Sequence, residues 1–294
     1  MLPDFIGLGA QKAGTTSLFH YLQGHPDICI ASSKETNFFY QDALFSKGLK
    51  YYEEIFFSHC SPGAIKGEIS PDYLYHTRCI ERLLTLPNRV KFIIIFRNPI
   101  DRAYSNYWME IRRGNEKLSF AEAVKREPER IKKGVRAKNT YSYIHRGFYD
   151  EQVAAYMDAF PDAKFLFILS EDLKCDRQNT METILRFLGV DAFAIDQTTF
   201  SKEHHTSSTA RWKCLQYYIV HQHWSRKILK WIIPHHNLRQ KAKKFIHKKN
   251  IKKETPPPLN ESLRMDLIRL YRPHNEKLGK MINRDLSHWN QPPS

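Results

Sequence analysis

The sequence predicts an α/β fold in which a central parallel sheet is flanked by helices. Two apolar runs, Val90–Phe96 and Lys164–Leu169, have the length and the β-branched or aromatic content of strands that are covered on both faces. Helical patterns of ten or more residues alternate with such runs, and this alternation requires crossover connections between parallel strands. A short apolar strand followed by a glycine-containing loop and a helix opens the chain.

The remaining elements are placed by the same criteria. Shorter strands are expected at Phe5–Leu8 and Ala64–Ile69. Val90–Phe96 is the most apolar run, so we expect it at the centre of the sheet. Helices are predicted at Thr15–Gln23, Gly147–Phe160, Asn179–Leu188 and about Asn260–Ile282.

The 294 residues are predicted to form one α/β domain with appendages. Residues 1–200 form the α/β core, 201–258 a basic helical insertion, and 259–294 a C-terminal helix that packs on the core. The three prolines at 256–258 separate the last two parts, because proline cannot continue a helix. No internal repeat or low-complexity tract is present.

Composition excludes a disordered chain, since 41% of the residues are hydrophobic and 13% aromatic. The net charge of +15 would attract nucleotide phosphates, anionic glycans, nucleic acid and acidic membranes alike. Much of the excess lies between Arg211 and Lys253, where it either binds a polyanion or forms a solvated basic helical face.

The five cysteines are odd in number and contain no CxxC pair, which argues against a disulfide framework or a zinc cluster and favours a reducing compartment. The pairs His204-His205 and His235-His236 have no cysteine or carboxylate at ligand-like spacing, so no metal site is predicted. Without a leader segment or long apolar span, the chain is expected to be soluble and cytoplasmic, although a chain trimmed of an anchor would have the same features.

The segment Gly9–Thr16 lies between the first strand and helix, where backbone N–H groups and the helix N-terminus can face an anion. The spacing of Gly9 and Gly14 matches the start of a Walker A loop. However, Thr15 follows Gly14, and the lysine is Lys12, two positions before that glycine. A phosphate site is therefore predicted, with generic mononucleotide binding as the alternative.

The strand Val90–Phe96 is followed by Arg97, where a magnesium-dependent nucleotidase would have an aspartate. An arginine there predicts a nucleotide bound by side-chain cations without a metal. Ser105 lies about two turns along the next helix, so Arg97 and Ser105 can bracket a second phosphate. Two separate phosphate sites suit a nucleotide with 3′ and 5′ phosphates. The alternative is that Arg97 and Arg102 pair with nearby carboxylates.

Together, Gln-Lys-Ala-Gly-Thr-Thr at 11–16, Arg-Asn-Pro at 97–99 and Ser105 resemble the sulfotransferases that use 3′-phosphoadenosine-5′-phosphosulfate (PAPS). The segments 34–39 and 67–73 resemble the branch that contains heparan sulfate N- and 3-O-sulfotransferases and bacterial relatives. The resemblance covers residues 4 to about 189 and the C-terminal end, whereas 211–255 is similar only in general character. It implies the P-loop NTPase-like sulfotransferase fold.

The resemblance implies transfer of a sulfuryl group from PAPS, with adenosine 3′,5′-bisphosphate as product and no metal. Lys12 would stabilise the charge that develops on the leaving oxygen during in-line displacement. Residues 12–16 would hold the 5′-phosphosulfate, and Arg97 with Ser105 the 3′-phosphate. The implied cofactor-binding residues are Gln11, Lys12, Ala13, Gly14, Thr15, Thr16, Ser17, Arg97, Ser105 and Tyr149. For Tyr149, packing in the core is the alternative role.

An attacking acceptor must lose a proton, so a base should stand beside it. The resemblance assigns this role to Glu35, which could instead cap a helix or pair with Lys34. Asn37 stands where some 3-O-sulfotransferases have histidine, and Ile69 where several have lysine. We therefore expect a small-molecule or glycan acceptor other than heparan sulfate, with a hydroxyl favoured over an amine. No specific nucleic-acid partner is predicted, and no pattern indicates an oligomeric state.

Two other functions were considered. A metal-dependent nucleotide kinase shares the strand, loop and helix opening, but it should carry Gly-Lys-Thr and an acidic strand end. A polyanion-binding protein would use the basic helices after Arg211, and such binding can coexist with catalysis.

Overall fold

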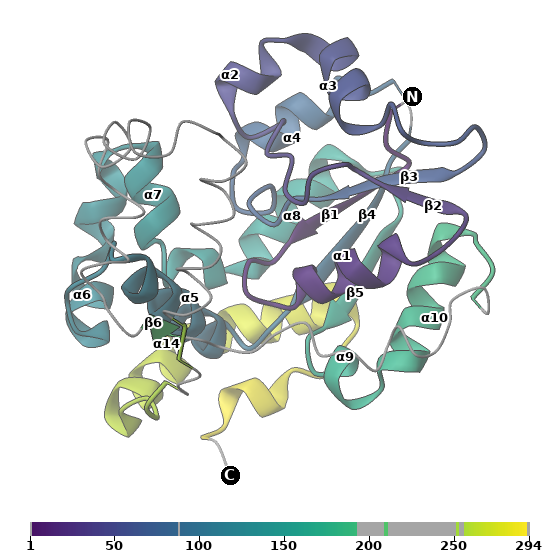
Figure 1. The fold of residues 1–294 in the computed structure, drawn as a ribbon. Helices are drawn as coiled ribbons and strands as arrows, with labels where there is room; N and C mark the ends of the chain where they lie inside the picture. Colours follow the sequence, from purple (N-terminus) through teal and green to yellow (C-terminus); the bar gives the residue numbers. More distant parts are fainter. Residues whose placement is uncertain (1, 88, 193–208, 211–250, 253–255, 293–294) are drawn as a thin grey trace. The chain divides into compact units, whose positions relative to one another are not determined.

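The computed structural model describes residues 2–87, 89–192, 209–210, 251–252 and 256–292 (Figure 1). It divides into two compact units, which we describe separately. The first comprises residues 1–102, 146–204 and 265–294, and the second comprises 103–145 and 205–264. The assignment of the whole chain to one domain stays a prediction. Nearly all of the basic region, at 211–250 and 253, lies outside the described residues.

The first unit contains a five-stranded parallel sheet with the order β2-β3-β1-β4-β5. Its strands are β1 (Phe5–Gly9), β2 (Ile28–Ile30), β3 (Ile65–Ile69), β4 (Lys91–Phe96) and β5 (Phe165–Leu169). The predicted parallel sheet is thus confirmed, and β2 was not predicted. The expectation that Val90–Phe96 forms the centre was wrong, because β1 is the middle strand. Gly7 lowers the apolar content of β1, and a Cβ there would lie 3.0 Å from Ile69.

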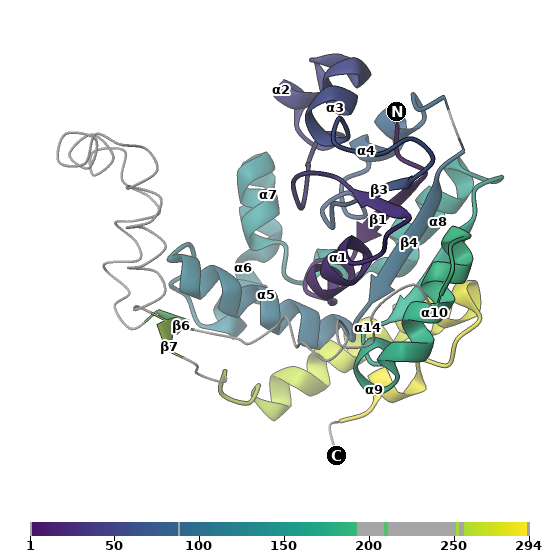
Figure 2. The same cartoon turned by 45° about the vertical axis from the view of Figure 1, so that its right-hand side comes forward.

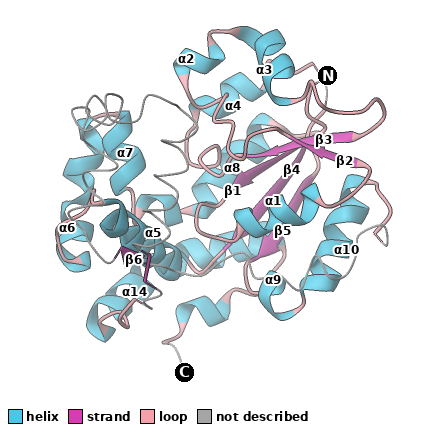
Figure 3. Cartoon of the chain, viewed as in Figure 1, coloured by secondary structure: helices cyan, strands magenta, loops and turns pink. Residues whose placement is uncertain are grey.

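Helices cover both faces of this sheet, with α1 and α8 on opposite sides (Figures 1 and 2). On the α8 face, the ring of Phe92 lies 5.9 Å from Tyr156 and 5.0 Å from Phe160. Figure 3 shows the strands surrounded by helices. The described helices of this unit include α1 (Thr15–Gln23), α2 (Asp42–Phe45), α3 (Gly48–Phe56), α4 (Arg78–Leu83), α8 (Tyr149–Ala159), α9 (Asp172–Cys175), α10 (Arg177–Leu188) and most of α14 (Glu261–Ile282).

The four helices predicted by range are present, the last as α14 (Glu261–Ile282), and the helix expected to follow Arg97 is present as α5 (Pro99–Arg113). Tyr271 of α14 is buried against Gly147. A Cβ atom at position 147 would lie 2.5 Å from the hydroxyl oxygen of Tyr271, so the two residues pack closely. Leu278 and Trp289 belong to the core cluster of the first unit. No helix in the described ranges is both long and apolar enough to span a bilayer.

The second unit contains most of α5 (Pro99–Arg113), α6 (Phe120–Arg130), α7 (Val135–Tyr141) and the two-residue strands β6 (Thr209–Ala210) and β7 (Ile251–Lys252). Buried carboxylates organise it. Glu116 accepts hydrogen bonds from Arg130 at 2.6 Å and Tyr143 at 2.9 Å. Burial favours a raised pKa for Glu116, but these donors and two backbone N–H groups outweigh it, so the pKa of Glu116 is lowered.

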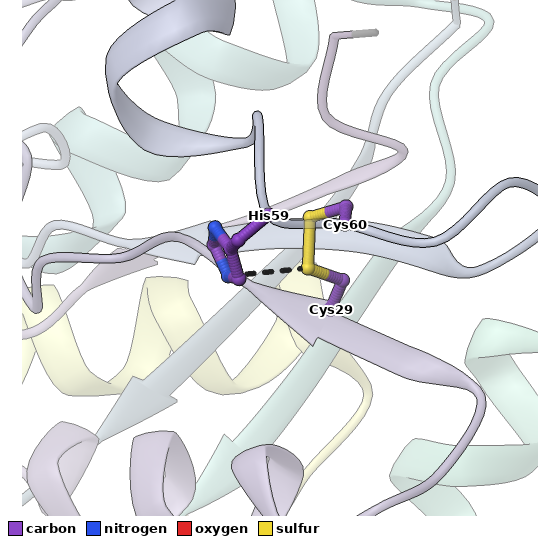
Figure 4. Close-up of side chains that lie close together, drawn as sticks. All are labelled: Cys29, His59 and Cys60. Atoms are coloured by element: carbon purple, nitrogen blue, oxygen red, sulfur yellow. Dashed lines mark hydrogen bonds between the residues drawn. A yellow bond between two sulfur atoms is a disulfide. The ribbon is translucent and has the colours of Figure 1, made fainter.

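A disulfide joins Cys29 of β2 to Cys60, just beyond α3 (Figure 4). The expectation of no disulfide was therefore wrong. The two cysteines lie 31 residues apart and are brought together by the fold, with a Cα–Cα distance of 5.6 Å. The spacing of two cysteines that are distant in sequence does not indicate such a contact, whereas a local CxxC pattern would indicate a cysteine pair.

Candidate active site

The candidate residues of the first unit gather at the carboxyl edge of the sheet. In open α/β sheets, ligands bind at this edge, where parallel strands lead into their loops. Strand β1 leads into residues 10–14, which we call the phosphate loop, and β2 leads into residues 31–41, which we call the β2–α2 loop. Because β3 lies between β2 and β1, the residues that follow β3 are neighbours of both loops.

The phosphate loop is fixed by a close contact with Leu74 at its start and by a left-handed turn at its end. A Cβ at Gly9 would lie 2.9 Å from Leu74, so only glycine fits there. The N–H of Ala10 donates to the carbonyl of Ile95 on β4 at 2.7 Å. Gly14 has a φ of 109° and precedes α1, a conformation that glycine adopts without strain.

The donor set of this loop fits an anion. The first turn of α1 presents N–H groups that the helix itself leaves without acceptors, at the positive end of its dipole. No acidic residue lies in that turn. The ammonium group of Lys12 and the hydroxyl groups of Thr15, Thr16 and Ser17 add further donors. A phosphate or sulfate group, and hence the 5′ end of PAPS, matches this chemistry.

Arg97 connects the phosphate loop to α8. Its Nη1 donates to the carbonyl oxygen of Lys12 at 3.1 Å, and its own carbonyl accepts from the hydroxyl of Tyr149 at 3.0 Å. Burial raises the pKa of Tyr149 to about 12, which keeps this hydroxyl protonated as a donor. The centre of the Tyr149 ring also lies 5.0 Å from that of the Phe96 ring, so Tyr149 packs in the core, which was the alternative role. Ser105 belongs to the second unit, and its joint role with Arg97 stays a prediction.

Glu35 lies in the β2–α2 loop with a φ of 62°, and Asn37 has a φ of 56°. The ammonium group of Lys34 lies 2.5 Å from the Glu35 carboxylate, so the predicted alternative of an ion pair is present. The helix-cap alternative is not, because the N-cap of α2 is Gln41. The Glu35 side chain is 38% exposed, and a bound acceptor therefore has access to it.

A buried carboxylate, Glu68 of β3, anchors the β2–α2 loop to the sheet. Glu68 is 0% exposed and accepts hydrogen bonds from the hydroxyls of Tyr52 at 2.6 Å, Ser70 at 2.9 Å, Tyr73 at 3.2 Å and Thr36. Burial raises the pKa of Glu68 in spite of these donors. Sequence analysis missed this role, although a glutamate inside an apolar strand pattern was a usable signal.

A second carboxylate follows β3. Asp72 accepts a hydrogen bond from Nη1 of Arg146 at 2.7 Å, and the Arg146 guanidinium lies 4.5 Å from the centre of the Tyr75 ring. The side chain of Arg146 is 3% exposed, whereas that of Asp72 is 21% exposed. Nε and Nη2 of Arg146 are buried without a hydrogen-bond partner in the described ranges. Arg146 therefore holds Asp72 at the edge between the two loops, and sequence analysis assigned it no role.

A set of possible metal ligands lies apart from this edge. Cys29, His59 and Cys60 bring ligand atoms within 4.8 Å of one another, which is the arrangement drawn in Figure 4. The two sulfurs are joined to each other in the structure, so neither is available as a thiolate ligand.

Comparison with known proteins decides the family. Residues 2–254 match the family model of the sulfotransferase domain. The chain belongs to this family. The predicted resemblance to PAPS-dependent sulfotransferases is thus confirmed, and the protein is a transferase.

Relatives of this sulfotransferase include the mouse heparan sulfate glucosamine 3-O-sulfotransferase 3B1, which is 26% identical over 219 residues. The human bifunctional heparan sulfate N-deacetylase/N-sulfotransferase 3 is 29% identical over 202 residues. These matches cover 73% and 64% of the chain, but only 52% and 22% of the relatives. A sulfotransferase structure from Alicyclobacillus acidocaldarius superposes with a TM-score of 0.71 and 25% identity, over 99% of this chain and 100% of that one. The likeness confirms the fold.

Proposed function

We propose that the protein transfers a sulfuryl group from PAPS to a hydroxyl group of a small-molecule or carbohydrate acceptor. The observation that carries this proposal is the phosphate loop, whose donors are N–H groups, hydroxyls and Lys12, with Arg97 bonded directly to its backbone. Such a donor set supports the binding of an anionic group such as a phosphate or a sulfate. The relatives named for heparan sulfate support the reaction class, although the chain spans only part of each.

PAPS supplies an activated sulfuryl group whose leaving group is a phosphate. Lys12 acts on the leaving oxygen, where an ammonium group stabilises the charge that develops in the transition state. The N–H groups of the loop and of the first turn of α1 hold the 5′ end in place, so the reacting atoms stay aligned for in-line displacement. Arg97, together with Ser105, is proposed to hold the 3′-phosphate.

On the acceptor side, Glu35 is proposed as the base that removes the proton of the attacking hydroxyl. It is exposed enough to meet an acceptor, and its ion pair with Lys34 must open or shift as it does so. Asp72 is the second candidate, because Arg146 fixes it between the two loops. Asn37 and the buried Ile69 differ from the residues of several relatives that act on heparan sulfate, so we propose a different acceptor.

The cytoplasm is proposed as the compartment, on the basis of the odd number of cysteines and the absence of a CxxC pair in the sequence. The disulfide is an observation against a permanently reducing environment. A cytoplasmic location and this disulfide are compatible if the disulfide can be opened by thiol exchange.

The direct test is release of adenosine 3′,5′-bisphosphate from PAPS in the presence of acceptor panels of phenols, sugars and primary amines, without added metal. We expect turnover with one hydroxyl class that is unchanged by a chelator, and loss of that turnover in Lys12→Ala. Turnover that requires Mg²⁺, or transfer of phosphate from ATP, would contradict the proposal.

A further inference from the structure

We propose that the Cys29–Cys60 disulfide is an exchangeable redox site that fastens the root of the β2–α2 loop, with His59 assisting its opening. The disulfide itself is a feature of the structure. Its link to the acceptor side rests on the function proposed above, whereas its exchange chemistry does not.

The position of Cys29 makes the bond a fastening for an otherwise weak strand. Cys29 lies in the middle of β2, which has three residues and sits at the edge of the sheet, where β3 is its one partner among the described strands. A short edge strand with one neighbour is held by few hydrogen bonds. The disulfide ties it to Cys60, whose N–H is bonded to Phe57 in the turn after α3.

The segment that follows β2 is held by the end of α3, the helix that precedes Cys60. The N–H of Ser32 donates to the carbonyl of Phe56 at 3.0 Å, and its hydroxyl donates to the carbonyl of Ile55 at 3.0 Å. Further along, the loop is anchored by Thr36 on Glu68 and by the buried side chain of Phe38. The stretch between these two anchorages contains Lys34 and Glu35. Opening the disulfide would therefore loosen the first anchorage of the proposed base and leave the second intact.

His59 stands where it can promote that opening. Its Nε2 lies 3.2 Å from the carbonyl oxygen of Ile30 and 3.4 Å from Sγ of Cys29 (Figure 4). A carbonyl oxygen only accepts, so Nε2 carries the proton in this contact, and the same N–H reaches the sulfur. A donor at this sulfur stabilises a thiolate on Cys29, and a stabilised thiolate is a better leaving group in thiol–disulfide exchange.

A dithiol is the reductant in the proposed exchange reaction. One thiolate of the dithiol attacks Sγ of Cys60, the Cys29–Cys60 bond breaks, and Cys29 leaves as a thiolate beside His59. The second thiol of the dithiol then attacks the mixed disulfide and releases Cys60. The dithiol ends as a disulfide, and the protein gains two electrons and two protons as two thiols.

The test compares the full-length protein purified without reductant before and after treatment with dithiothreitol. Peptide mapping by mass spectrometry should show the Cys29–Cys60 link before treatment and two free thiols after it. Hydrogen exchange of the backbone amides at 29–35 should then become at least about tenfold faster, while that at 12–16 is unchanged. The midpoint of thermal unfolding should fall by about 5–10 °C.

Variants separate the parts of the proposal. The double variant Cys29→Ala with Cys60→Ala should behave like the reduced protein and should not respond to dithiothreitol. Cys175→Ala, which changes an exposed free cysteine in α9, is the matched control and should respond like the parent. His59→Ala should form the same disulfide but lose it about tenfold more slowly in dithiothreitol.

Three results would overturn the proposal: free Cys29 and Cys60 thiols in protein purified without reductant, loop exchange that does not change on reduction, or stoichiometric Zn²⁺ retention by the reduced protein with an unchanged loop. The last result would make the cluster a metal site. Binding of adenosine 3′,5′-bisphosphate is measured in both redox states and should agree within about twofold, because 12–16 is unaffected. Failure to bind in either state would refute the proposed function and leave the redox result standing.

Discussion

The phosphate loop and the β2–α2 loop leave the same edge of one sheet, yet they are shaped by different means. The phosphate loop is set mainly by glycines of its own sequence, namely Gly9, where only glycine fits beside Leu74, and Gly14, which forms the left-handed turn. The β2–α2 loop is set by side chains that are distant in sequence, namely Glu68 with its hydroxyl donors and the Cys29–Cys60 bond. A loop of the first kind can be predicted from a local pattern, whereas the second kind depends on the completed fold.

The largest effect is expected at Lys12. Lys12→Ala removes the cation nearest the proposed leaving group, and the loss of one preorganised donor of this type lowers turnover by about 100- to 1,000-fold. Initial rates with PAPS measure this, with circular dichroism to check the fold. Lys50→Ala, the same change at an exposed position of α3, is the control and should retain full activity. Equal activity of the two variants would refute the role of Lys12.

Glu35→Gln probes the other loop. Removal of a general base lowers turnover by about 100-fold or more, and high pH should partly restore the rate because the acceptor then ionises more readily. The pH–rate profile of the variant is the measurement. An unchanged profile would transfer the role of base to Asp72, and Asp72→Asn would then be the variant that alters the profile.

Arg97→Ala tests the link between the phosphate loop and the nucleotide. Loss of its charged donors should weaken the binding of adenosine 3′,5′-bisphosphate by about 10- to 100-fold, since a hydrogen bond from a charged group contributes about 1.5–3 kcal/mol. Adenosine 5′-phosphate, which lacks the 3′-phosphate, should lose much less affinity. Arg89→Ala, at an arginine with an 83% exposed side chain, should change neither affinity.

The smallest effect concerns the anchorage of the β2–α2 loop. Tyr52→Phe removes one donor from buried Glu68 and should destabilise the fold by about 1–3 kcal/mol at neutral pH. Burial raises the pKa of Glu68, so the folded state holds its proton more tightly than the unfolded state. Stability linked to this group is therefore greatest below the ordinary carboxyl pKa and falls as pH rises through the raised value.

The cost of Tyr52→Phe should accordingly be smaller at pH 5 than at pH 7.5, because a protonated carboxyl needs fewer donors. Urea denaturation at both pH values measures this. Tyr51→Phe, at the adjacent and more exposed tyrosine, is the control and should be nearly neutral. An equal cost at the two pH values would contradict the account of Glu68.

Sequence reasoning predicted four of the five strands and the helices α1, α8, α10 and α14, because each has a clear apolar period or a glycine signal. It missed β2, which is too short for a periodic pattern, and it placed β4 at the centre because Gly7 makes β1 less apolar. Its assignment of Lys12, Arg97 and Glu35 to the site stays a prediction, and it did not find the contacts of Glu68 and Arg146. The Thr36–Glu68 and Asp72–Arg146 hydrogen bonds join residues that are 32 and 74 positions apart, respectively.

We propose that the site recognises a nucleotide with 3′ and 5′ phosphates without a metal. Calorimetric titration with adenosine 3′,5′-bisphosphate and with ATP, each with and without Mg²⁺, tests it most directly. We expect tight binding of the bisphosphate that does not change with Mg²⁺, and far weaker binding of ATP. Preference for ATP in the presence of Mg²⁺ would contradict it and would favour a nucleotide kinase.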